Sequence, residues 1–242
     1  MNVPDPVRAV TDGHRLRRVW RNELGGLTYQ IGTGGSRRFV KWAPAGSGLD
    51  LDAEAARLRW AGRYTAVPPV LDSGADAAGN WLVTAGLPGE NAVSRRWKAD
   101  PATAVAAIGR GLRHLHDTLP VDGCPFSWGA ADRLAVIHAM NPGPGSGKLA
   151  RLADIPPVDV AVVCHGDSCA PNTLIADDGT CTGHVDLGAL GVADRWADLA
   201  VATWSTTWNY GSGWEDALLD AYGIGPDPAR TAYYRLLWDL GP

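Results

Sequence analysis

The 242-residue sequence lacks any run that approaches the roughly 18 continuous apolar residues of a membrane-spanning helix. Its N-terminal segment contains no apolar stretch of the kind found in a secretion signal, so we expect a cytoplasmic protein with no membrane partner. Basic residues are not in excess, because 22 lysines and arginines stand against 26 acidic residues. The net charge of −4 argues against a general nucleic-acid-binding function and is compatible with a cationic ligand.

Cysteine is also scarce, with four residues in the chain. In the absence of a secretion signal we expect reduced thiols. Cys164, Cys169 and Cys181 fall close in sequence to His165 and His184, which makes a zinc site an alternative. Their spacing matches none of the common structural zinc patterns, so buried thiols beside strands are the preferred interpretation.

The first third of the chain has the pattern of a small β-sheet. Runs rich in β-branched and aromatic residues are separated by glycine-rich turns, and one segment among them repeats leucine and alanine at helical spacing. The expected order is strand, strand, strand, helix, strand, strand, over residues 17–23, 27–32, 37–43, 49–62, 67–74 and 80–86.

After residue 86 the sequence becomes mainly helical in pattern. The expected helices cover residues 101–119, 194–204, 213–223 and 227–240, with short strands at 160–164, 173–176 and 182–187. We therefore predict an α+β fold with two lobes. Residues 1–86 would form a small antiparallel β-sheet with one helix, and residues 87–242 a larger, mainly α-helical lobe.

The densest group of polar residues surrounds the short strands. Asp167 and Asn172 follow the strand expected at 160–164, and Asp186 follows a later apolar strand. Carboxylate and amide oxygens are ligands that Mg²⁺ prefers, and Asp167 would remain free to accept a proton from an attacking hydroxyl. Phosphoryl transfer requires this set of groups. Asp and Asn are also common turn residues, but the combined pattern H-G-D-x4-N and D-x-G is more specific than a turn.

A second group of residues has the pattern of a nucleotide site. Lys41 lies within an apolar strand and Glu54 in the following helix, as in the lysine–glutamate pair with which protein kinases hold nucleotide phosphates. Lys41 alone would be equally typical of an edge strand. A glycine-rich turn would cover the phosphates, and the backbone after the last strand would bond the adenine edge. The residues expected at the nucleotide are Lys41, Glu54, Gly25, Gly26, Thr28, Ala85 and Leu87.

The order of these motifs resembles that of the aminoglycoside phosphotransferases, which have a protein-kinase-like fold. The resemblance is strongest at residues 162–172, "VVCHGDSCAPN", and 181–200, "CTGHVDLGALGVADRWADLA", and it covers nearly the whole chain. The segments look most similar to streptomycin 3″-phosphotransferases, with kanamycin-type 3′-enzymes next. The resemblance implies that Asp167 is the catalytic aspartate, that Asn172 and Asp186 bind Mg²⁺, and that ATP is the phosphoryl donor.

The resemblance further implies that the acceptor is a hydroxyl of an aminoglycoside antibiotic, which phosphorylation would inactivate, and that His165 supports the catalytic loop. We expect a monomer. Acidic residues of the C-terminal lobe would attract the cationic antibiotic, although acids on helix faces are more often simply solvated. The acids expected at the substrate are Asp194, Glu215, Asp216 and Asp239. Eleven tryptophans are expected mainly in the core, with one or two at the substrate.

Three features depart from the family pattern. Ala189 stands where the family usually has arginine, Asp239 is all that remains of an acidic pair at the C-terminus of the 3′-enzymes, and the loop around 138–155 looks short. Two alternatives therefore stay open: a kinase of another natural product, such as a peptide or nucleoside antibiotic, and a non-catalytic nucleotide-binding protein.

Overall fold

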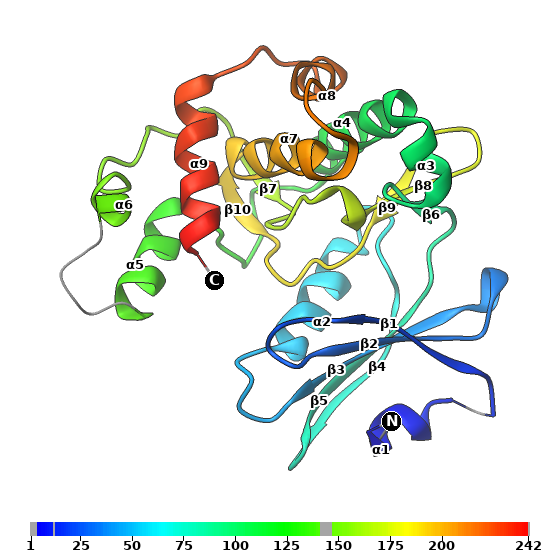
Figure 1. Cartoon of the computed structure of the whole chain (residues 1–242). Helices are drawn as coiled ribbons and strands as arrows, with labels where there is room; N and C mark the ends of the chain where they lie inside the picture. The colour runs from blue at the N-terminus through cyan, green and yellow to red at the C-terminus, as the bar shows by residue number, and fades with distance from the viewer. Residues whose placement is uncertain (1–3, 12, 141–146, 242) are drawn as a thin grey trace. The chain divides into compact units, whose positions relative to one another are not determined.

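The computed structural model describes residues 4–11, 13–140 and 147–241 (Figure 1). The chain divides into two compact units, residues 1–88 and 89–242. The centre of the loop that looks short in the sequence, residues 141–146, lies outside the described residues. In the described part, every helix falls short of the length and apolar character that a membrane crossing requires.

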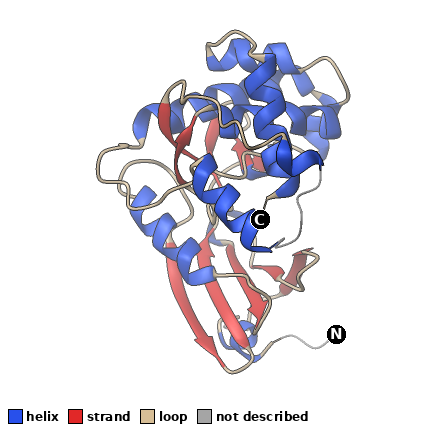
Figure 2. Ribbon diagram, turned by 90° about the vertical axis from the view of Figure 1, so that its left-hand side faces the viewer, coloured by secondary structure: helices blue, strands red, loops and turns tan. Residues whose placement is uncertain are grey.

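The first unit is built on one antiparallel sheet with the strand order β1-β2-β3-β5-β4 (Figures 1 and 2). Helix α2 connects β3 to β4 and packs on β3, β4 and β5. The predicted succession of three strands, one helix and two strands is confirmed. The elements are β1 Leu16–Arg21, β2 Leu27–Ile31, β3 Arg38–Pro44, α2 Leu51–Ala61, β4 Val70–Asp76 and β5 Gly79–Ala85.

The two faces of this sheet have different partners because successive side chains of a strand point to opposite sides. Val40 on β3 belongs to an apolar cluster with Val7 of α1, Asp5–Ala9. The next residue, Lys41, is bonded to Glu54 of α2. The sequence did not predict α1, since five residues are too few to display a helical period. Its place is decided by the apolar face that Val7 covers.

The second unit is mainly helical, as predicted, with two small antiparallel sheets of order β10-β7 and β6-β8-β9. A short 3₁₀ turn, Ala170–Asn172, leads into β8. The elements are β6 Glu90–Asn91, α3 Arg95–Ala99, α4 Pro101–Thr118, α5 Ala130–Met140, α6 Gly147–Ala150, β7 Ala161–Cys164, β8 Thr173–Ile175, β9 Cys181–His184, β10 Gly191–Asp194, α7 Trp196–Tyr210, α8 Glu215–Tyr222 and α9 Pro228–Leu240.

One boundary in this unit differs from the prediction. A helix was expected from residue 194, whereas residues 191–194 form β10, which pairs with β7. The carboxylate of Asp194 accepts a hydrogen bond from the backbone N–H of Trp196, the first residue of α7. The strand escaped prediction because its pairing partner lies thirty residues away in sequence.

Helix α4 is the central helix of the second unit and contacts α3, α7, α8 and three strands. Its approach to α8 is close at Gly109, where an added Cβ atom would lie 2.5 Å from the backbone oxygen of Leu218 and 2.8 Å from the Cβ of Ala221. Glycine lowers helix propensity, so its presence inside α4 is explained by packing rather than by local preference.

Replacing a glycine inside a helix with alanine usually stabilises the helix, but the close approach of α4 and α8 predicts the opposite effect at Gly109. Replacing Gly109 with alanine should lower the free energy of unfolding by about 1–3 kcal/mol, because the methyl group must push α8 away. Gly147→Ala in α6 is the matched control, since none of the described residues lies within 4 Å of its added Cβ. Urea unfolding should show the control equal to or slightly more stable than the wild type. A Gly109→Ala protein as stable as the wild type would contradict this packing.

Candidate active site

The first unit places Lys41 and Glu54 together, as the sequence predicts. The ammonium Nζ of Lys41 lies 2.6 Å and 2.8 Å from the two carboxylate oxygens of Glu54. The side chain of Glu54 is 7% exposed, whereas that of Lys41 is 25% exposed. Thr28 lies directly opposite Lys41 on β2, so both side chains emerge on the same face of the sheet. This geometry presents a cation, oriented by a buried acid, beside a hydroxyl.

The glycine turn between β1 and β2 is used differently from the prediction. The N–H of Gly26 donates to the side-chain Oδ1 of Asn22 at 2.6 Å, and the N–H of Gly25 donates to the backbone oxygen of Asn22 at 3.3 Å. Both donors are therefore occupied within the turn, and contacts with phosphate through them would require these bonds to open. Asparagine at the first position and glycine at the fourth are typical of a type I turn, so residues 22–25 were recognisable as a turn, whereas the use of both N–H groups within it was not.

The segment after β5 is also partly occupied. The N–H of Ala85 donates to Pro69 O at 2.9 Å, and the carbonyl of Leu87 accepts a bond from the Arg37 guanidinium. Neither of these two groups can bond an adenine edge while those contacts persist. Of the backbone N–H groups of the two residues expected there, that of Leu87 is the one without such a bond among the described residues.

In the second unit, a buried carboxylate organises the loop that carries Asp167. Asp198 of α7 is fully buried. Its carboxylate accepts hydrogen bonds from the N–H groups of His165 at 2.6 Å and Gly166 at 2.9 Å, and it bonds His116 Nε2 at 3.0 Å. Burial acts to raise the pKa of the Asp198 carboxyl, but the hydrogen bond and charge interaction with His116 outweigh it and hold the pKa below its usual value. The sequence analysis missed Asp198, although a lone acid within an apolar helical run is a signal of a buried carboxylate.

His165 supports the same loop through both ring nitrogens. Its Nε2 lies 2.9 Å from the carbonyl oxygen of Val185, and its Nδ1 lies 3.2 Å from the backbone nitrogen of Asp167. A carbonyl can only accept and a backbone N–H can only donate, so the ring is neutral and carries its hydrogen on Nε2. These contacts are those of a structural support and leave no lone pair for use as a base.

Asp167 and Asn172 form a hydrogen-bonded pair. The Nδ2 of Asn172 donates to the backbone oxygen of Asp167 at 2.9 Å and to its Oδ2 at 3.1 Å. Among the described residues nothing bonds the other carboxylate oxygen, Oδ1, although it is buried. A buried carboxylate oxygen without a partner is costly unless a ligand supplies one. The amide of Asn172 directs its nitrogen to Asp167, which leaves its oxygen for another ligand.

Asp186 lies two residues after β9, in a left-handed backbone conformation with φ of 61°. Non-glycine residues adopt this conformation rarely, and such strain is concentrated at functional sites. The preceding residue, Val185, donates its N–H to the backbone oxygen of Asn172 at 2.9 Å, which ties the two segments together. An amide oxygen from Asn172 and a carboxylate from Asp186 are the hard donors that Mg²⁺ requires. The residues present therefore fit a magnesium ion.

The loop leaves no room for a side chain at Gly166. Its φ is +87°, and an added Cβ would lie 2.6 Å from the Cβ of Ala189. Ala189, which stands where the family usually has arginine, thus packs directly against the loop before Asp167.

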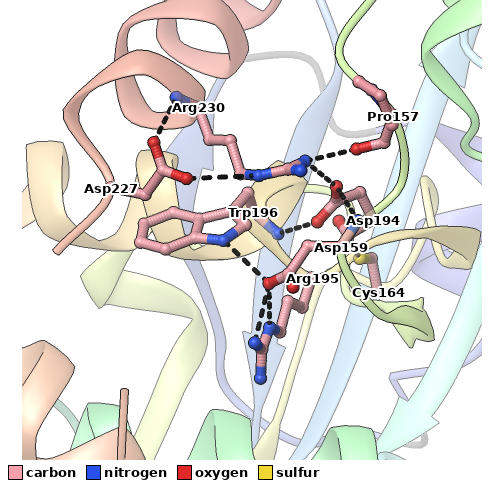
Figure 3. Close-up of polar contacts among 8 residues, drawn as sticks. All are labelled: Pro157, Asp159, Cys164, Asp194, Arg195, Trp196, Asp227 and Arg230. Atoms are coloured by element: carbon pink, nitrogen blue, oxygen red, sulfur yellow. Dashed lines mark hydrogen bonds and ion pairs between the residues drawn. The ribbon is translucent and has the colours of Figure 1, made fainter. Parts of the chain in front are cut away.

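The four acids expected at the substrate are not equivalent, and Asp194 belongs to the interior. Its side chain is fully buried and bonds the Arg230 guanidinium at 2.8 Å, the N–H of Asp159 at 2.9 Å and that of Trp196 (Figure 3). Arg195 pairs with Asp159 in the same network. The expectation that Asp194 faces a cationic substrate is therefore wrong, because its carboxylate is consumed by the fold. The sequence could not separate it from a surface acid, since its partners are distant in sequence.

Glu215 and Asp216 line a pocket of about 300 Å³ bordered by residues of α7, α8 and α9. Glu215 is paired with Arg235 at 2.9 Å and Asp239 with Lys148 at 3.1 Å. Both pairs are partly exposed, so they remain accessible to a competing cation.

The thiols do not assemble as the zinc alternative requires. Among the described residues, the one group of three potential ligands consists of His116, Cys164 and Asp198. Cys164 donates its thiol hydrogen to Asp194 O at 3.4 Å, and burial raises the pKa of this thiol well above its ordinary value. Burial, with the nearby charge of Asp167, also raises the pKa of Cys169. Cys164 is thus a buried thiol and Cys169 a half-buried one, and the raised pKa favours the protonated form of both.

Comparisons with known proteins agree with this geometry. Residues 20–234 match the model of the phosphotransferase enzyme family. The chain is 34% identical to an aminoglycoside 3′-phosphotransferase of Streptomyces fradiae, over 93% of this chain and 94% of that protein. It is 36% identical to a streptomycin 3″-kinase of Streptomyces griseus, over 81% and 82% of the two chains.

Solved structures give the same result. Aminoglycoside phosphotransferase APH(3″)-Id of Streptomyces rimosus matches with a TM-score of 0.79 and 29% identity, over 97% of this chain and 95% of that one. The same protein in complex with ADP and streptomycin matches with a TM-score of 0.69 and 27% identity, over the same shares. The fold and the arrangement of acids define a phosphoryl-transfer enzyme of the kinase-like class. The chain belongs to the phosphotransferase enzyme family, and the predicted fold class is confirmed.

The contact between Gly166 and Ala189 predicts a sharp effect on activity. Gly166→Ala should lower kcat by at least about tenfold, because the strained methyl group must displace the loop that positions Asp167. Gly34→Ala is the control for a glycine at positive φ, since nothing lies within 4 Å of its added Cβ. Steady-state kinetics on folded proteins should show activity lost in the first variant and kept in the second. Equal activities would refute the steric argument.

A buried histidine predicts a pH dependence of stability. Burial and the neighbouring His165 lower the pKa of His184 to about 3. The unfolded chain takes up this proton near pH 6.5, so the unfolded state binds more protons between about pH 6.5 and 3. The free energy of unfolding should therefore fall as the pH drops through this window. His184→Gln should show a shallower dependence of Tm on pH, whereas the exposed control His138→Gln should keep the wild-type slope. Three equal slopes would exclude this origin.

Proposed function

We propose that this phosphotransferase uses ATP to phosphorylate a hydroxyl of an aminoglycoside, with the 3″ hydroxyl of a streptomycin-type acceptor favoured. The observation that carries the proposal is the unpartnered, buried Oδ1 of Asp167 beside the amide of Asn172. The relatives, which include an aminoglycoside 3′-phosphotransferase, a streptomycin 3″-kinase and an enzyme solved with ADP and streptomycin, support the acceptor class. Phosphorylation of such an antibiotic would inactivate it.

On the donor side, Lys41 contacts the α and β phosphates of ATP, and Glu54 fixes the direction of its ammonium group. Thr28, on the same sheet face as Lys41, adds a hydroxyl donor. The N–H of Leu87 is the proposed adenine contact. The burial of Glu54 matters here, because an acid held in one rotamer positions the lysine before the nucleotide arrives.

On the acceptor side, the oxygen of the acceptor hydroxyl attacks the γ-phosphorus, and the bond between that phosphorus and the bridging oxygen of ADP breaks. Asp167 accepts the proton that the hydroxyl loses. The Asn172 amide holds the second carboxylate oxygen of Asp167, so that Oδ1 is the one directed to the hydroxyl. Asn172 and Asp186 would hold magnesium, which when bound neutralises charge on the phosphates. Because the transition state is loose, positioning supplies most of the rate enhancement.

An acceptor panel tests the proposed function. The purified protein is incubated with Mg²⁺-ATP and streptomycin, kanamycin, a peptide antibiotic or a nucleoside antibiotic, and products are examined by mass spectrometry and NMR. Streptomycin should gain one phosphate, on its 3″ oxygen. If both aminoglycosides stay unmodified while another compound gains phosphate, the acceptor assignment fails. A protein that binds ATP and phosphorylates nothing would be a nucleotide-binding protein without this activity.

The role of Asp167 is tested by an acid-to-amide change. Asp167→Asn should lower kcat about 10²- to 10⁴-fold, because the acceptor proton loses its base. Its dissociation constant for ATP, measured by calorimetry, should change less than about threefold, since Lys41, Thr28 and Leu87 lie in the other unit and Asp167 is not a proposed magnesium ligand. Asp178→Asn, the same change in an exposed turn, is the control and should leave kcat unaltered. If Asp167→Asn turned over as fast as the wild type, Asp167 would not be the base that accepts the proton of the acceptor hydroxyl.

A further inference from the structure

Three tryptophans of the second unit pack together. Trp204 and Trp208 lie one turn apart on α7, with ring centroids 4.8 Å apart, and Trp238 of α9 lies 6.1 Å and 5.6 Å from them. We call these residues the tryptophan cluster. Trp208 is 48% exposed, and Trp204 and Trp238 are partly buried. Nearly half of Trp208 is thus accessible to solvent and to a ligand.

The tryptophan cluster borders the loop that carries Asp167. Ser205, the neighbour of Trp204, accepts the N–H of Ala170 in that loop at 2.9 Å. Residues of a helix advance by about 100° each, so Asp198 and Ser205 face the loop. Ala200 and Thr203 face α9, where both accept hydrogen bonds from Arg235. Positions 204 and 208 fall between these two faces, on one side of α7. A molecule bound against Trp208 therefore lies beside the helix face that holds the catalytic loop.

Two acids of this region, Glu215 and Asp239, are paired within the chain, whereas Asp216 of α8 is exposed. Glu215 is held by Arg235 at 2.9 Å and Asp239 by Lys148 at 3.1 Å. The acid of α7, Asp198, is fully buried and serves the loop. An ammonium group, which is compact and strongly hydrated, needs carboxylates to replace its water. The tryptophan cluster offers indole faces instead.

Indole faces suit a guanidinium group. This cation is planar and weakly hydrated, so it leaves water and stacks on aromatic rings more readily than an ammonium group does. The chain itself provides an example, because the guanidinium carbon of Arg235 lies 5.8 Å from the ring centroid of Trp204. The opposite end of the tryptophan cluster, at Trp208, is the exposed one.

We propose that the exposed face of Trp208 binds a planar guanidinium group of the acceptor and so selects guanidinium-bearing aminoglycosides over those whose cations are all ammonium groups. This inference rests on the proposed function and deepens it by naming the chemical class of the acceptor. Trp208 is thus a specificity residue, and Trp204 and Trp238 hold its ring in place.

The test uses streptomycin, which carries guanidinium groups, and kanamycin, whose cations are ammonium groups. Dissociation constants are measured by calorimetry in the presence of ADP and Mg²⁺, and KM is measured with each acceptor. The wild type should bind streptomycin more tightly. Trp208→Leu should weaken streptomycin binding and raise its KM by about 5- to 30-fold, with kanamycin binding changed less than about twofold. Trp208→Phe, which keeps an aromatic face, should recover most of the affinity.

Tyr64→Leu is the matched control, because Tyr64 is an exposed aromatic residue of the first unit that also stacks with a tryptophan. It should leave both acceptors unaffected, and the Tm of each variant shows that folding is intact. If Trp208→Leu leaves streptomycin binding unchanged, or weakens both acceptors equally, the inference is overturned while the phosphotransferase activity stands. A wild type that binds streptomycin through Trp208 but transfers no phosphate would instead refute the proposed function alone. A wild type that neither binds nor phosphorylates streptomycin refutes both.

Discussion

The buried carboxylate of Asp198 is the interaction on which the rest of the second unit depends. A charge removed from water is tolerated only if donors surround it. Here those donors are the backbone N–H groups of His165 and Gly166 and the ring of His116. Because backbone groups supply two of the bonds, satisfying the charge fixes the path of the chain immediately before Asp167. Burial of Asp198 is costly, but the hydrogen bonds that compensate for it hold Asp167 in a defined position. Phosphoryl transfer requires such positioning.

The groups assigned to chemistry share a second property, which is stored strain or unmet bonding capacity. Asp186 holds a left-handed conformation, and Asp167 keeps a buried oxygen without a partner among the described residues. Such features lower stability and persist where the surrounding structure enforces them. By contrast, Lys41 and Glu54 already form an ion pair with each other. In the proposed mechanism the donor side is therefore preformed, whereas the acceptor side is complete only with a hydroxyl and a cation in place.

The acids expected at the substrate and the tryptophan cluster are the features of the second unit that would distinguish one cationic acceptor from another. Of the four acids expected at the substrate, Asp194 is inside the protein, Glu215 and Asp239 are paired with an arginine and a lysine, and Asp216 is exposed. Trp208 of α7 adds an exposed aromatic ring to this region. The family relationship establishes phosphoryl transfer, while the choice of acceptor depends on these few side chains.

The sequence by itself determined the succession of elements in the first unit and the pairing of Lys41 with Glu54, because strand alternation and helical spacing are local patterns. It also located Asp167 in a loop after a strand. Only the tertiary structure decided that Asp194 is internal, that Asp198 holds the loop, and that the glycine turn uses its own N–H groups. The positions of both acids depend on partners far away in sequence, and the glycine turn depends on which acceptors its N–H groups bond. Burial and hydrogen bonding are properties of the packed chain, so the residue type alone does not distinguish an acid on the surface from an acid in the core.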